Sequence, residues 1–66
     1  MEPKYSQVKV KLVGEDGNAF AIMGAVQRAM RKAGLSQEQI DEYLKESKAG
    51  DYDHLLQTAM RFVEVS

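Results

Sequence analysis

The sequence predicts a small α+β domain with one N-terminal strand, then three helices, and a short C-terminal strand as an open option. Before residues 14–18 the apolar residues alternate with charged ones, and after them they recur every three or four positions. Helix-capping residues then divide the rest of the chain into three helical segments. Because 66 residues suffice for one domain only, residues 1–66 are expected to fold as one unit, with residues 1–5 flexible.

The strand is predicted over residues 8–12. Val8, Val10 and Leu12 share one face, and Lys9 and Lys11 lie on the solvated face. A single strand leaves its backbone donors and acceptors unpaired, so it needs a partner. The sequence leaves two partners open: residues 62–66 of the same chain, or a strand of another chain.

The first helix is predicted from about Ala19 to Ala33. The dense turn chemistry of residues 14–18 precedes it, and Asp16 or Asn18 can cap it. Its apolar stripe comprises Ala19, Ile22, Met23, Val26, Ala29, Met30 and Ala33, and its wet face Gln27, Arg28, Arg31 and Lys32.

Two glycines of this region have separate explanations. Gly34 is a ready C-terminal cap for the first helix. Gly24 lies inside the helix, where glycine costs roughly 1 kcal/mol relative to alanine. We expect a close crossing of another element to account for it.

The second helix begins with a capping box. Residues 36–39, Ser-Gln-Glu-Gln, fit that motif, and Leu35 is placed to pack on Ile40 as a hydrophobic staple. Ile40, Tyr43 and Leu44 form a narrow apolar stripe, and residues 48–50 end the helix.

The third helix is predicted from a cap at Asp51 to about Val63. Its apolar residues follow the best helical pattern in the chain: Tyr52, Leu55, Leu56, Ala59, Met60 and Val63. Residues 62–66 have a strand-like composition, so they form either a short strand or the fraying end of this helix.

The predicted core combines the apolar stripes of all four elements. Its members are Val8, Val10, Leu12, Phe20, Met23, Val26, Met30, Leu35, Ile40, Leu44, Leu55, Leu56 and Met60.

The composition offers little for catalysis, and we predict that the chain is not an enzyme. It has no cysteine and one histidine, so no cofactor or metal site is expected. Asp51, Asp53 and His54 are close in sequence, but ligands one or two positions apart do not share a helix face. Gly14 and Gly17 lack the spacing of a phosphate-binding loop.

The chain shows no membrane span and no apolar leader. With its cysteine-free composition, this predicts a cytoplasmic protein that does not act at a membrane.

Charge is divided unevenly along the chain, although the net charge is −1. Residues 1–34 have a balance of +3 and residues 35–66 a balance of −4. This pattern fits attraction between the two halves, or between two copies. The alternative is nucleic-acid binding by the basic half, through Lys9, Lys11, Arg28, Arg31 and Lys32.

Residues 31–40 resemble the junction of the first two helices in repressor-type helix-turn-helix domains. That resemblance implies DNA binding by the following helix. The sequence departs from the pattern at Asp41, where those domains have a small residue. Asp51 and Asp53 would also face the phosphates. The similarity covers ten residues and depends mostly on capping chemistry.

Three segments carry a wider resemblance: residues 12–20 (LVGEDGNAF), Ala33-Gly34, and residues 50–56 (GDYDHLL). Through them the chain resembles a set of short uncharacterised bacterial and phage proteins, over nearly its whole length after Gln7. The resemblance implies a small domain and a phage or prophage origin, but no chemistry.

The strand motivates our functional prediction, a non-enzymatic interaction or self-association module. The strand would join a second copy, giving a homodimer, or the sheet edge of another protein. Residues 4–13 would form the interface, with Val8, Val10 and Leu12 as its apolar residues.

Overall fold

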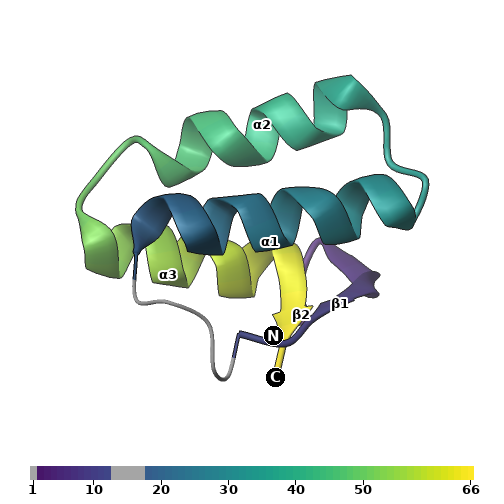
Figure 1. Cartoon of the computed structure of the whole chain (residues 1–66), viewed down its shortest axis with the longest axis horizontal. Helices are drawn as coiled ribbons and strands as arrows, with labels where there is room; N and C mark the ends of the chain where they lie inside the picture. The colour runs from purple at the N-terminus through teal and green to yellow at the C-terminus, as the bar shows by residue number, and fades with distance from the viewer. Residues whose placement is uncertain (1, 13–17) are drawn as a thin grey trace.

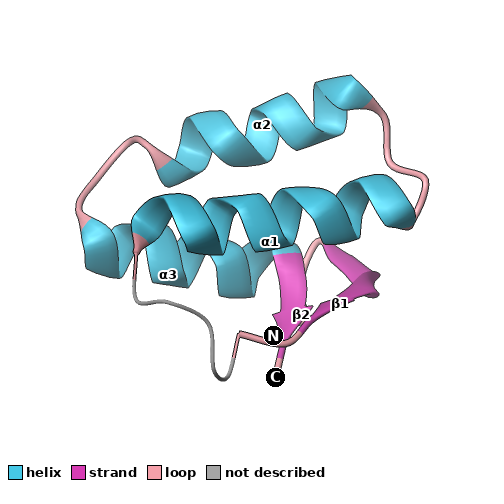
Figure 2. Cartoon of the chain, viewed as in Figure 1, coloured by secondary structure: helices cyan, strands magenta, loops and turns pink. Residues whose placement is uncertain are grey.

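The computed structural model describes residues 2–12 and 18–66 and confirms the α+β class. Figure 1 shows α2 running back along α1 and α3 running back along α2, and Figure 2 shows the two strands grouped beside this helical layer. The predicted turn at 14–17, including the Asp16 cap and the Gly14 and Gly17 loop, lies outside the described residues. In chain order the elements are β1 (Tyr5–Val10), α1 (Ala19–Lys32), α2 (Gln37–Ser47), α3 (Tyr52–Phe62) and β2 (Val63–Val65).

β1 and β2 form a parallel two-stranded sheet, so the first strand has its partner within the chain. Val10 lies opposite Val65, and the amide of Ser66 donates to the carbonyl of Val10 at 2.9 Å. Parallel strands need a long crossover connection, which the three helices supply. β1 also begins earlier than predicted, at Tyr5, and ends at Val10, so Leu12 lies beyond it.

The main core lies between the sheet and the helices. It contains Val8, Val10, Val26, Met30, Ile40, Tyr43, Ala59, Phe62 and Val63, and a second cluster contains Ile22, Met23 and Leu55. Most predicted core residues are therefore confirmed. Leu12, Leu35, Leu44 and Leu56 are half-buried and pack against these clusters.

Two core predictions are wrong. Phe20 is 78% exposed and Met60 is 55% exposed. Phe20 precedes the buried Ile22 by two residues, about 200° around the helix, and Met60 precedes Phe62 by the same interval. Phe20 lies at the edge of the buried stripe, about 60° from Met23, and Met60 lies on the side of α3 away from Phe62.

Phe62 replaces Met60 as the core residue at the end of α3. Its ring lies edge-on to Tyr43, with centroids 5.5 Å apart, and 6.1 Å from the ring of Tyr5. α3 ends at Phe62, and Val63, predicted as its last residue, begins β2 instead. The buried Phe62 thus fixes the point at which the chain turns from helix to strand.

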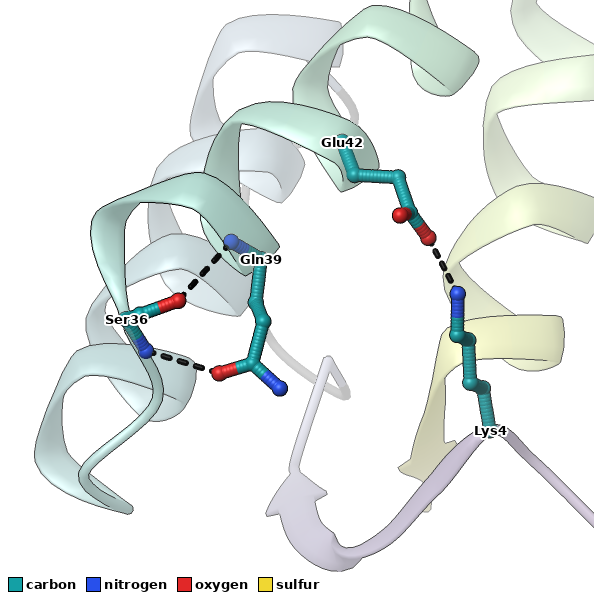
Figure 3. Close-up of polar contacts among 4 residues, drawn as sticks. All are labelled: Lys4, Ser36, Gln39 and Glu42. Atoms are coloured by element: carbon teal, nitrogen blue, oxygen red, sulfur yellow. Dashed lines mark hydrogen bonds and ion pairs between the residues drawn. The ribbon is translucent and has the colours of Figure 1, made fainter.

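Side-chain caps begin all three helices. Asn18 accepts the amide of Phe20 at 2.7 Å, and Asp51 accepts the amide of His54 at 2.9 Å. The capping box of α2 is confirmed: Ser36 accepts the amide of Gln39, whose side chain accepts the amide of Ser36 (Figure 3). These bonds satisfy amides that a helix start leaves without partners.

Gly34 closes α1 in a left-handed conformation, with φ at 90°. Its amide donates to Arg31, and that of Leu35 donates to Met30, which is the Schellman arrangement. The cap predicted here is confirmed.

Gly24 does not mark a close crossing, so that expectation is wrong. A methyl group placed on it would meet only the guanidinium of Arg28, at 3.9 Å. Gly50 differs, because a methyl group there would lie 2.7 Å from the side chain of His54.

Tyr43 and Ser47, one turn apart on α2, are fully buried, and neither hydroxyl has a hydrogen-bond partner among the described residues. Burial raises the pKa of Tyr43, and the nearby Ser47 hydroxyl opposes this rise more weakly.

We expect alanine to change the free energy of unfolding in opposite directions at Gly24 and at the other two glycines, Gly34 and Gly50. Gly24→Ala should raise the free energy of unfolding by about 0.5–1 kcal/mol, since the helix gains propensity without a clash. Gly34→Ala should lower it by about 1–2 kcal/mol, because alanine resists a positive φ. Gly50→Ala should also destabilise, through contact with His54. Urea unfolding measures all three, and a destabilised Gly24→Ala variant would reveal a neighbour packed against that position.

Because the pKa of Tyr43 is raised in the folded chain, we expect the folded chain to lose stability in alkali. The folded chain binds the phenol proton more tightly than the unfolded chain, whose tyrosines ionise near pH 10. Stability is therefore independent of this group below pH 10 and falls as pH rises above it. Tyr43→Phe should lose less stability between pH 9 and 11 in urea unfolding than the parent, with Tyr52→Phe as the exposed control. Equal losses in parent and Tyr43→Phe would contradict the assignment.

Candidate functional site

The open edge of β1 presents unpaired backbone groups. The carbonyl of Val10 accepts from Ser66, and the amide of Leu12 donates to Ser66 at 3.3 Å, so these residues face β2. Backbone groups of successive strand residues point to opposite edges, and therefore those of Lys9 and Lys11 point away from β2. Within residues 2–12 and 18–66, no backbone hydrogen bond outside the helices and the sheet ladder reaches either lysine.

A groove of about 310 Å³ lies between β1 and the end of α1. α1 packs on β1, and this groove lies where the two elements meet. The small side chains of Ala29 and Ala33 on α1 leave room for this groove. The lining residues are Gln7, Val8 and Lys9 from β1, and Ala29, Lys32 and Ala33 from α1.

The structure brings some of the predicted cationic residues together. Lys9 and Lys32, from different elements, line this one groove. Lys9 is 77% exposed at its side chain, and its Nζ lies 3.8 Å from Glu64. Lys11, exposed, follows Lys9 by two residues, as expected for one strand face. We call Lys9, Lys11 and Lys32 the lysine rim.

Neither of the other two cationic residues lines this groove. Arg28 lies one helical turn before Lys32 and is exposed. Arg31 reaches toward α2 instead, with its guanidinium 3.5 Å from the amide oxygen of Gln37. Arg31 is therefore directed away from the lysine rim, whereas Arg28 lies beside Lys32 on the same face of α1.

The apolar residues predicted for an interface are occupied by the chain's own core. Val8 is 1% exposed and Val10 is 5% exposed. Leu12 is half-buried and packs against both core clusters. The edge of β1 can offer a partner its backbone and its lysines, while these apolar side chains point inward.

Lys4 fastens the N-terminal segment to the helical layer. Its amide donates to the carbonyl of Arg61 at 2.8 Å, and its side chain forms an ion pair with Glu42 (Figure 3). The hydrogen bond with Glu42 raises the pKa of Lys4. The ammonium also lies 5.5 Å from the ring of Phe62. These contacts position β1 beside the end of α3.

His54 and its acidic neighbours serve the helix ends. Asp51 caps α3, and Nε2 of His54 lies 2.8 Å from the carbonyl of Glu46 near the end of α2. Among the described residues, no three His, Asp or Glu side chains gather closely enough to hold a metal ion. The contacts of Asp51 and His54 thus connect the end of α2 to the start of α3.

A second groove, of about 430 Å³, lies between the starts of α1 and α3 and the end of α2. The exposed rings of Phe20 and Tyr52 line it, with Met23 and Leu55 beneath. Sequence reasoning missed this groove because Phe20 was assigned to the core. Its position off the buried stripe of α1 is the signal that identifies it.

None of the helices in the described part of the chain combines the length and apolarity that crossing a membrane requires. Comparisons with protein-family models, curated proteins and solved structures find no match to this chain. The resemblance to short bacterial and phage proteins stays a prediction.

Proposed function

We propose that this chain is a non-enzymatic protein-interaction module, in which the open edge of β1 accepts an extended segment of another protein. The observation that carries the proposal is the direction of the backbone. The bonds of Val10 and Leu12 to Ser66 turn the amides and carbonyls of Lys9 and Lys11 outward. An added strand would pair with those groups, as in other cases of β-augmentation.

The lysines favour a foreign segment over a second copy. If two β1 strands paired in antiparallel fashion, Lys9 and Lys11 of one copy would face the same lysines of the other. Like charges directly opposite each other destabilise a strand pair. Lysines on an edge strand also discourage unwanted self-pairing.

The expected affinity is modest. Lys9 and Lys11 offer two amides and two carbonyls, and a hydrogen bond contributes about 0.5–1.5 kcal/mol net. Ordering an extended segment offsets part of this gain. Side chains that enter the groove beside Ala29 and Ala33 would supply the rest. The proposal therefore describes a reversible partner, and the cysteine-free composition suits a reducing compartment such as the cytoplasm.

A displayed library of random ten-residue segments, selected on the immobilised chain, tests this function. Selected segments should slow hydrogen exchange at the amides of Lys9 and Lys11 in the parent chain. They should bind at least tenfold more weakly to Lys9→Pro, which removes an outward donor and spares the bonds to β2.

Lys9→Ala keeps the amide and removes the side chain, so the loss of affinity in Lys9→Pro beyond that in Lys9→Ala measures the missing backbone donor. Circular dichroism shows whether each variant is folded. Segments that protect other amides, such as those around Phe20 and Tyr52, and leave Lys9 and Lys11 unchanged would contradict the proposal. This readout uses the parent chain, so it does not depend on the folding of the proline variant.

A further inference from the structure

We propose that the segment added to β1 is acidic, with carboxylates at alternate positions that face Lys9 and Lys11 of the lysine rim. This inference rests on the proposed function and specifies the chemistry of the partner. Its basis is the juxtaposition of an open strand edge, a groove and three lysines drawn from β1, α1 and the residue after β1.

The sheet already contains one example of the proposed pairing. Glu64 on β2 lies opposite Lys9, with its carboxylate 3.8 Å from the ammonium. A strand on the other side of β1 would place its own side chains at the same spacing, about 4.5–5.5 Å between Cβ atoms. A carboxylate there would meet Lys9 from the opposite side.

Lys11 has no carboxylate opposite it in the sheet register, whereas Lys9 has Glu64. Continuing the register from Lys9 and Glu64 places Ser66 opposite Lys11, which is a neutral neighbour. Lys32 adds a third ammonium at the α1 wall of the groove, and no carboxylate is among the described residues that line it. The edge therefore has an excess of positive charge that an acidic segment would neutralise.

The groove indicates what the intervening residues should be. Residues that alternate with the carboxylates would point to the α1 side, where Val8, Ala29 and Ala33 line the groove. Valine or another small apolar residue suits those walls. The expected pattern is glutamate or aspartate alternating with a small apolar residue.

The backbone argues for a peptide over a nucleic acid. The open edge alternates amide donors with carbonyl acceptors, which a peptide strand matches group for group. Phosphate oxygens only accept hydrogen bonds, so they would leave the carbonyls of Lys9 and Lys11 unpaired and would approach them with like partial charge. The lysines alone do not distinguish these two polyanions, but the backbone between them does.

Three ten-residue peptides test the inference on the isotope-labelled chain. Each has valine at alternate positions and glutamate, threonine or lysine at the others, with Gly-Ser ends for solubility. At low salt the glutamate peptide should bind about tenfold more tightly than the threonine peptide and should protect the amides of Lys9 and Lys11. Added salt at 0.5 M should shrink that preference, because it screens the charge pairs.

Lys11→Glu is the sharpest variant, because its neighbour Ser66 is neutral and the fold should tolerate the change. It should weaken the glutamate peptide about five- to tenfold and strengthen the lysine peptide. Lys45→Glu makes the same charge change on the exposed face of α2 and should leave the peptide preference unchanged. If the two variants had equal effects, the preference for the glutamate peptide would follow from the net charge of the chain alone, and the inference would be overturned.

The remaining outcomes separate this inference from the proposed function. Equal binding of the threonine and glutamate peptides, with protection of Lys9 and Lys11, would overturn the acidic preference and leave strand addition standing. No protection by any peptide or selected segment would remove both. A DNA duplex that binds at Lys9 and Lys32, while no peptide protects the edge, would assign the lysine rim to nucleic acid.

Discussion

The pairing of β1 with β2 is the constraint on which the rest of this fold depends. It joins the two ends of the described chain, and the parallel direction obliges everything between them to act as a crossover. The three helices return the chain to the same end of the sheet, and the buried rings of Phe62 and Tyr43 fix where α3 gives way to β2. The same pairing selects which backbone groups of β1 are used internally and which face outward. The fold and the binding surface that we propose therefore both depend on one short ladder.

Attraction between the oppositely charged halves of the chain reinforces this closure. Both ion pairs found among the described residues, Lys4 with Glu42 and Lys9 with Glu64, connect residues 1–34 with residues 35–66. These pairs are exposed, so each contributes little stability by itself. Their main effect is on the arrangement of the chain, because they favour the approach of the N-terminal segment to α2 and β2. The uneven charge of the sequence thus has an intramolecular explanation for two lysines, while Lys11 and Lys32 lie outside it.

Local chemistry made much of the fold predictable. The capping box of α2, the Asp51 cap and the Gly34 cap involve residues at most a few positions apart, so their geometry follows from sequence. The β2 strand was left open because three residues with two valines do not show whether they end a helix or enter a sheet. Phe20 and Met60 were misplaced for a related reason, since a broad apolar stripe does not say where its buried centre lies. The lysines of the candidate site were identified individually, but the meeting of Lys9 and Lys32 in one groove depends on tertiary packing.

The late position of β2 has a consequence for how the molecule folds. The ladder between β1 and β2 closes a loop of about fifty residues, and long-range closure of this kind slows folding relative to the formation of local helices. In a partially folded chain whose helices have formed but whose ladder has not, β1 has neither an edge paired with β2 nor a defined open edge. The segment that we propose would bind only the completed sheet, so it would stabilise the folded chain over such a partially folded one. In a chain of 66 residues, occupation of the edge by the proposed segment would therefore be measurable as an increase in the free energy of unfolding.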